Sequence, residues 1–143
     1  NQRVFGANYF WEKFYSSQCY IVCDKRGDMP EVPLCDTEFA WTSFTEKMPK
    51  RYQVINHGFI KDDKSEIFHP TQKPLILFEK ILVDFSLDRQ TVYEPFSGSG
   101  TTIIACENLS RKARAVEISP AYVAVAIQRW VDVTGKEPIL LDA

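Results

Sequence analysis

The sequence predicts an α/β protein built on a doubly wound parallel sheet. Three observations lead to this class. Strand-like and helix-like runs alternate from about residue 69 onward, a Gly-Ser-Gly turn joins one strand to the next helix, and 143 residues with 45% hydrophobic content can bury one core. We expect right-handed crossovers, with ligands bound at the carboxyl ends of the strands.

The first of three segments runs from residue 1 to about residue 44. Strand-like runs are predicted at Arg3–Ala7, Cys19–Cys23 and Glu38–Ser43. Between the first two, the aromatic stretch NYFWEKFY (residues 8–15) is predicted to be helical. The sequence begins with Asn rather than Met, so we expect a piece of something longer.

The second segment, residues 45–68, is polar, rich in turn residues and without a clear period. This pattern predicts a loop or small excursion on the surface of a single domain that spans residues 1–143.

The third segment has the most regular pattern. Pro74 suits the first turn of a helix in which Phe78, Ile81, Leu82 and Phe85 recur at helical spacing. The elements predicted after it are strand Thr91–Pro95, a helix to about Leu109, strand Ala113–Ile118, a helix from Pro120 to about Val133, and a final strand Pro138–Asp142.

Charge, hydropathy and cysteine content argue against several classes of protein. The 17 basic and 19 acidic residues leave a net charge of −2, so bulk attraction to nucleic acid or membrane is not indicated. No apolar run approaches the roughly 20 residues of a membrane span, and no signal peptide is recognised, so a cytoplasmic protein is expected. The cysteines are irregularly spaced and only two histidines accompany them, which predicts buried, reduced thiols and no metal site. They are Cys19, Cys23, Cys35 and Cys106.

The glycine turn after strand Thr91–Pro95 predicts a ligand site. Gly98 and Gly100 permit backbone angles and close approaches that a Cβ would obstruct, and the next helix presents free N–H groups. Glu117 follows the next strand, 23 positions after Glu94, where a carboxylate is suited to accept both hydroxyls of a ribose. A tight turn beside a solvated Glu117 is the alternative interpretation.

Departures from the dinucleotide pattern decide between cofactors. Ile103 stands where G-x-G-x-x-G/A requires glycine or alanine, and Glu94 would repel a pyrophosphate. The same carboxylate suits the ammonium of a methionine moiety, so S-adenosylmethionine is favoured over NAD.

At this point the residues resemble a family. EPFSGSGTT (residues 94–102), together with HPTQKP (residues 69–74), resembles the amino-directed DNA methyltransferases of the permuted beta-group, which methylate adenine N6 or cytosine N4. A weaker resemblance covers nearly the whole chain. It implies a Rossmann-like, S-adenosylmethionine-dependent methyltransferase fold. The cofactor-binding residues it implies are Glu94, Pro95, Phe96, Ser97, Gly98, Ser99, Gly100, Thr101, Thr102, Glu117, Ile118, Thr71, Gln72, Lys73 and Pro74.

Within this resemblance, the turn would bind the methionine part of the cofactor and HPTQKP would pack over it. Glu117 would hold the ribose and Ile118 would flank the adenine. Two residues depart from the family pattern, because Glu94 replaces the usual Asp and Ala115 stands where glycine is common. Both departures can lower the affinity for the cofactor.

The catalytic tetrapeptide of the family, D-P-P-Y or S-P-P-Y, is absent, because the sequence contains no Pro-Pro. In the permuted order it is expected upstream of Asn1, together with the central strand that leads into it. The resemblance therefore implies an incomplete fold with two half-sheets, and a chain that is inactive alone. A homodimer or a complementing N-terminal fragment would close the open sheet edge.

Double-stranded DNA is the partner that the resemblance implies, in a cytoplasmic enzyme of prokaryotic or phage type. Phosphate and base contacts would come from the target-recognition-like segment 45–68, although an ordinary solvated loop would have the same composition. The candidate DNA-contacting residues are Lys47, Lys50, Arg51, His57 and Lys61.

Three functions are compared. The leading one is a site-specific DNA methyltransferase, or a fragment of one, of restriction-modification type, which flips its target base and moves a methyl group from S-adenosylmethionine to an exocyclic amino group. The absent tetrapeptide favours a non-catalytic DNA-binding or regulatory remnant. A Rossmann oxidoreductase is opposed by Ile103 and Glu94.

Overall fold

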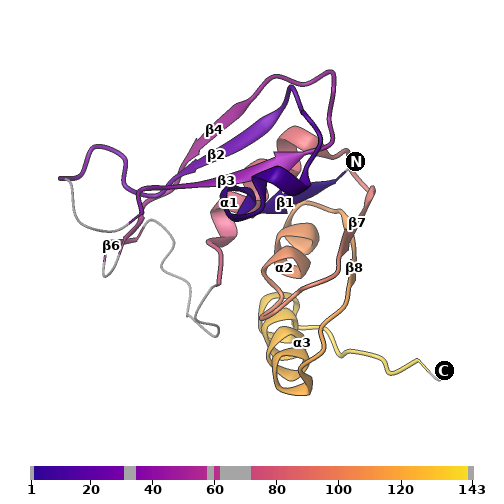
Figure 1. The fold of residues 1–143 in the computed structure, drawn as a ribbon. Helices are drawn as coiled ribbons and strands as arrows, with labels where there is room; N and C mark the ends of the chain where they lie inside the picture. The colour runs from indigo at the N-terminus through magenta and orange to yellow at the C-terminus, as the bar shows by residue number, and fades with distance from the viewer. Residues whose placement is uncertain (1, 31–34, 58–59, 62–71, 142–143) are drawn as a thin grey trace. The chain divides into compact units, whose positions relative to one another are not determined.

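A computed structural model describes residues 2–30, 35–57, 60–61 and 72–141 of the chain (Figure 1). The chain divides into two compact units, an N-terminal unit, Asn1–Lys64, and a C-terminal unit, Ser65–Ala143.

The N-terminal unit is built around a four-stranded sheet in the order β1-β3-β2-β4. Its strands are β1 (Arg3–Phe5), β2 (Tyr20–Asp24), β3 (Thr37–Thr42) and β4 (Lys50–Gln53). β3 pairs antiparallel with both β1 and β2, whereas β4 pairs parallel with β2. A separate antiparallel pair is formed by β5 (Asn56–His57) and β6 (Ile60–Lys61).

Apolar side chains of β2 and β3 form the buried part of this unit. Ile21, Ala40 and Trp41 are buried. The Trp41 ring stacks on Phe14 at 4.9 Å, and its indole N–H donates to the Tyr15 carbonyl at 3.1 Å. These contacts hold the aromatic stretch that precedes β2 against the sheet.

Two expectations for this unit were wrong. The aromatic stretch forms two short 3₁₀ helices, η1 (Ala7–Tyr9) and η2 (Trp11–Lys13), instead of one α-helix. Residues 50–53, expected in a loop, form β4, because Tyr52 and Val54 alternate inward and pack in the core. With only two buried apolar side chains, the alternation of apolar and polar residues that marks a strand cannot be recognised in this polar sequence.

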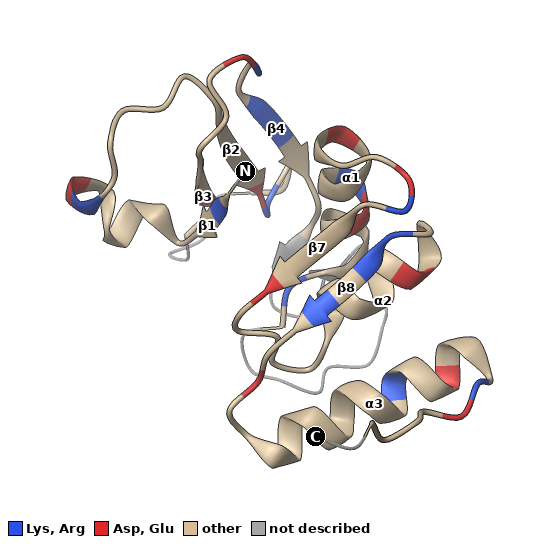
Figure 2. Ribbon diagram, turned by 90° about the vertical axis from the view of Figure 1, so that its right-hand side faces the viewer, with Lys and Arg blue, Asp and Glu red and all other residues tan. Residues whose placement is uncertain are grey.

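The C-terminal unit contains the predicted β-α-β arrangement. Strands β7 (Thr91–Glu94) and β8 (Lys112–Ala115) pair in parallel and are joined by helix α2 (Thr101–Asn108). Helix α1 (Leu75–Phe85) precedes β7, and α3 (Pro120–Thr134) follows β8. Figure 2 shows β7 and β8 side by side and pointing the same way. Glu94 is the last residue of β7, and Glu117 follows β8 by two positions.

Helices α1 and α2 share a core with the two strands. Leu82 of α1 is buried with Ala105 and Cys106 of α2. Partly buried neighbours complete this cluster: Leu75, Phe78, Val92, Leu109 and Ala113. The three helices predicted for the C-terminal unit are correct in type and nearly correct in their first and last residues.

Of the final strand expected at Pro138–Asp142, the described residues 138–141 form no strand. Residues 135–141 have no regular secondary structure, and Ile139, Leu140 and Leu141 are exposed. An apolar run is enough to predict a strand, but a strand forms only where a neighbour pairs with it. The α/β class is confirmed, whereas the incompleteness of the fold stays a prediction.

Three of the four cysteines are buried, as expected, and all four are free thiols. Cys35 is exposed, so the expectation of burial was wrong for this residue. In the described part of the chain, no helix has the length and apolar character needed to cross a bilayer.

Candidate functional site

The loop between β7 and α2 has the left-handed backbone that its glycines permit. Gly98 has φ 54° and Gly100 has φ 80°, a region that residues with a Cβ rarely adopt. The turn closes on itself where the Gly100 N–H donates to the Ser97 carbonyl at 3.0 Å. This confirms the predicted strand, turn and helix.

Helix α3 lies directly against this turn. A Cβ placed on Gly100 would lie 2.7 Å from the Ala126 Cβ and 3.2 Å from its Cα. Two features therefore require glycine at position 100: its left-handed backbone angle and the close approach of α3.

The carboxylate of Glu94 is held by groups of its own loop. One oxygen accepts the Phe96 N–H at 3.1 Å, and the other accepts the Thr102 hydroxyl at 3.2 Å. Because Thr102 is in the first turn of α2, Glu94 links the end of β7 to the start of the helix. Each carboxylate oxygen retains a lone pair for a further donor.

Glu117 is brought to the same turn by the parallel pairing of the strands. Ala115 is the register partner of Glu94, so Glu117 emerges two residues beyond it at the same sheet edge. Its Oε2 accepts the Gly98 N–H at 2.7 Å, and its Oε1 accepts the Ser119 N–H at 2.9 Å. Two acidic residues 23 positions apart in sequence thus contact one loop.

Part of the HPTQKP segment also contacts the turn. Gln72 accepts the Ser99 hydroxyl through Oε1 at 2.9 Å, and Pro74 stands at the N-cap of α1. Lys73 lies between them and is partly buried. Thr71 lies outside the described residues.

The surroundings of the turn combine exposed apolar side chains with buried polar ones. Phe96 and Ile118 are 88% and 97% exposed. Ser97 Oγ, in contrast, is buried and has no hydrogen-bond partner among the described residues. A ligand with an apolar ring and polar groups would satisfy both features. The other predicted positions are Pro95, which is exposed, and Thr101 and Thr102, which are buried.

One further residue of this region, Arg129, was not among the predicted site residues. It lies on α3, one turn after Ala126, is buried, and donates to Ser99. The available signal was its position three residues after a small apolar residue in an amphipathic helix, where a charged side chain faces the core and needs a polar partner.

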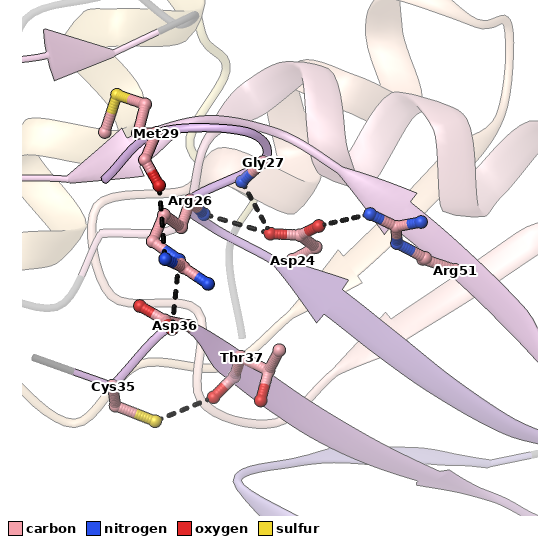
Figure 3. Close-up of polar contacts among 8 residues, drawn as sticks. All are labelled: Asp24, Arg26, Gly27, Met29, Cys35, Asp36, Thr37 and Arg51. Atoms are coloured by element: carbon pink, nitrogen blue, oxygen red, sulfur yellow. Dashed lines mark hydrogen bonds and ion pairs between the residues drawn. The ribbon is translucent and has the colours of Figure 1, made fainter. Parts of the chain in front are cut away.

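The candidate DNA-contacting residues of the N-terminal unit differ in the contacts that their side chains make. Arg51 on β4 is held by Asp24, whose Oδ2 accepts its Nη2 at 2.6 Å. Asp24 Oδ1 also accepts the N–H groups of Arg26 and Gly27, at 3.0 and 2.8 Å (Figure 3). These bonds, that of Arg51 foremost, lower the pKa of the Asp24 carboxyl.

Of the remaining candidates, Lys50 precedes Arg51 on β4 and is exposed. Lys47 places its ammonium 5.8 Å from the centre of the Phe44 ring. His57 and Lys61 lie in β5 and β6, and their side chains fall outside the description. Lys50 and Arg51 are consecutive residues of β4, so their side chains point to opposite faces of the sheet. Their role in DNA contact stays a prediction.

No group of three or more His, Cys, Asp or Glu among the described residues is placed to hold a metal ion.

Comparison with known proteins gives consistent matches. A family model described as DNA methylase, for N6- and N4-directed enzymes, matches residues 18–128. The type II methyltransferase M.BglII of Bacillus subtilis is 35% identical over 115 residues, which are 80% of this chain and 28% of that protein. M.HpaI of Haemophilus parainfluenzae is 38% identical over 61 residues, 43% of this chain and 19% of its own.

Among solved structures, the M1.HpyAVI–SAM complex superposes with a TM-score of 0.59 at 29% identity, covering 78% of this chain and 60% of that one. The matched part of the chain spans 19% and 28% of the length of M.HpaI and M.BglII.

Proposed function

Because the chain belongs to the N6/N4 DNA methylase family, we propose that it carries the S-adenosylmethionine-binding part of a site-specific DNA methyltransferase. The reaction would transfer the cofactor methyl group to the exocyclic amino group of adenine (N6) or cytosine (N4) in double-stranded DNA. One observation carries the proposal: Glu94 and Glu117, from the ends of two parallel strands, flank a turn formed by Gly98 and Gly100.

The residues present fit this cofactor. Two backbone N–H groups orient the Glu117 carboxylate, a group suited to accept ribose hydroxyls, while Glu94 offers negative charge to the methionine ammonium. Exposed Phe96 and Ile118 would cover the adenine, and Ser97 Oγ would gain a partner. S-adenosylmethionine supplies an electrophilic methyl group. The protein residues hold and orient it.

The nitrogen-activating tetrapeptide does not occur in these 143 residues. We propose that another segment or chain supplies it, so that this chain alone is inactive. The edge strands β1 and β7 are suited to receive such a fragment, or a second copy, by strand pairing. DNA contact would involve Lys50 and Arg51 on β4, in a cytoplasmic enzyme of restriction-modification type.

A second candidate is a non-catalytic, DNA-binding or regulatory remnant of such an enzyme. The absence of any Pro-Pro sequence favours it. Both candidates retain the cofactor site and differ only in methyl transfer.

Binding calorimetry tests the cofactor assignment. We expect S-adenosylmethionine to bind and NAD not to bind. Gly98→Val should abolish binding, because the turn has a left-handed backbone there, and Glu117→Ala should weaken it by about 1–3 kcal/mol through lost hydrogen bonds. Glu137→Ala, which changes an exposed glutamate after α3, is the matched control and should bind as the parent does. Tight NAD binding without a response to S-adenosylmethionine would refute the proposal.

Transfer of labelled methyl groups to duplex DNA separates the enzyme from the remnant. We expect no transfer by the chain alone and transfer after a fragment containing D-P-P-Y or S-P-P-Y is added. Transfer by the isolated chain would show that its catalytic residues are present after all, and continued inactivity with the added fragment would favour the remnant.

A further inference from the structure

Arg129 is a buried cation on helix α3 that contacts the glycine turn between β7 and α2. Its exposed fraction is 8%. Nη1 donates to the Ser99 carbonyl at 2.5 Å and lies 3.1 Å from the Ser99 hydroxyl oxygen. A buried arginine is costly unless its donors are satisfied, so this placement indicates a specific role for the contact with Ser99.

The contact restrains one peptide group at both ends. The Ser99 carbonyl accepts from Arg129, and the N–H of the same peptide group, that of Gly100, donates to the Ser97 carbonyl at 3.0 Å. Gly100, on one side of this peptide group, tolerates several backbone conformations. With both ends of the peptide bonded, rotation of its plane would break two hydrogen bonds. Arg129 therefore limits a freedom that Gly100 creates.

The same serine passes the restraint to the segment before α1. Arginine can only donate, so the Ser99 hydroxyl oxygen accepts from Arg129 and its own hydrogen is directed to Gln72 Oε1, at 2.9 Å. The hydrogen bonds thus run in one direction, from α3 through the turn to Gln72. Three segments of the C-terminal unit are connected by this chain of bonds.

We propose that Arg129 is a positioning residue for the cofactor, which locks the Ser97–Gly100 turn and Gln72 in the arrangement that binds S-adenosylmethionine. The inference rests on the proposed function. Arg129 acts through Ser99 and does not itself touch the cofactor. Ala126, one helical turn earlier, sets the distance between α3 and Gly100, and Arg129 sets the orientation of the peptide beside it.

The test compares Arg129→Met and Arg129→Lys with two controls, Gln128→Met on the same helix and Arg114→Met, which removes an exposed arginine. In the full chain, Arg129→Met should weaken binding of S-adenosylmethionine and of S-adenosylhomocysteine by about tenfold or more. Arg129→Lys should recover part of the affinity, because its ammonium can still donate to the Ser99 carbonyl. Both controls should bind as the parent does.

Amide hydrogen exchange gives a readout that needs no cofactor. Arg129→Met should accelerate exchange of the Gly100 N–H, and Gln128→Met should leave it unchanged. Parent-like affinity and parent-like exchange in Arg129→Met would overturn the inference. If the parent binds no S-adenosylmethionine, the proposed function fails, whereas the exchange measurement still decides whether Arg129 locks the turn.

If Arg129→Met does not fold, Ser99→Ala tests the same hydrogen-bonded connection. It removes the hydroxyl that connects Arg129 to Gln72 but leaves the carbonyl that Arg129 contacts. We expect a loss of affinity of about threefold or more, with the folded state retained. In a double-mutant cycle, Ser99→Ala and Gln72→Ala together should lose less affinity than the product of their separate losses, because both substitutions break the same bond. Independent, multiplying losses would contradict the connection.

Discussion

Two glutamates of the candidate site owe their orientation to backbone N–H groups. Glu117 accepts from Gly98 and Ser119, and Glu94 accepts from Phe96. The role of an acidic residue can be predicted from its spacing after a strand. Which N–H groups hold it depends on the conformation of the loop. The sequence therefore predicts that both residues lie beside the turn, but not which groups hold them.

Gly100 and Gly135 provide a matched pair at the residue scale. Both have positive φ, 80° and 66°, but a Cβ on Gly100 would meet Ala126, whereas at Gly135 it would meet nothing within 4 Å. We expect Gly135→Ala to cost about 1 kcal/mol of unfolding free energy, from backbone strain alone. Gly100→Ala should cost about 1–3 kcal/mol more, because α3 must shift. Urea unfolding measures both, and equal losses would contradict the close packing of α3.

Asp24 should contribute to the pH dependence of stability. Hydrogen bonds from Arg51 and from the Gly27 and Arg26 N–H groups lower its pKa below the ordinary 3.8. A carboxyl with a lower pKa in the folded state stabilises the fold above the unfolded value, and this stabilisation is lost as the pH falls through the folded pKa.

We therefore expect Asp24→Asn to be less stable than the parent at about pH 7 and to lose less stability on acidification to about pH 3. Exposed Asp28 supplies the control Asp28→Asn, which should follow the parent. Urea unfolding over this range is the measurement. An Asp24→Asn curve parallel to that of the parent would show that the Asp24 bonds do not matter for folding.

At the scale of elements, helical periodicity predicted more than apolar content did. The predicted apolar positions of α1 are largely those that face the core, whereas the apolar run after α3 forms no strand. A helix satisfies its backbone within itself, so its pattern is local. A strand needs a partner, and β4 formed from a polar sequence because β2 pairs with it.

Neighbouring residues of α1 test its packing. Leu82 is 3% exposed and lies in the cluster with Ala105 and Cys106, whereas Val83 is 59% exposed. We expect Leu82→Ala to lower the unfolding free energy by about 2–5 kcal/mol. Val83→Ala should change it by about 0.5 kcal/mol or less, as is typical of surface substitutions. Chemical denaturation compares them, and a small effect of Leu82→Ala would mean that α1 does not pack as described.

At the scale of the whole molecule, the reactivity of the cysteines tests whether the cores of both units are folded. Cys19 and Cys23 are buried in the N-terminal unit and Cys106 in the C-terminal unit, where burial raises the pKa of Cys106 to about 11. Only the thiolate reacts readily, so Cys35 should be alkylated first in the native protein.

All four thiols should react once the chain is unfolded in urea. Mass spectrometry after a timed exposure to iodoacetamide counts them. Rapid modification of Cys106 in the native state would contradict the core between α1 and α2, and rapid modification of Cys19 or Cys23 would contradict the core of the four-stranded sheet.

By itself, the amino-acid sequence determined the α/β class, the helices α1, α2 and α3, the glycine turn and the acidic residues beside it. These features depend on residues close together in the chain and on backbone angles that glycine alone adopts easily. Only the tertiary structure decided that β4 joins the sheet, that residues 138–141 form no strand, and that Arg129 holds Ser99. Strand pairing and buried hydrogen bonds join residues about 30 positions apart, and packing chooses their partners.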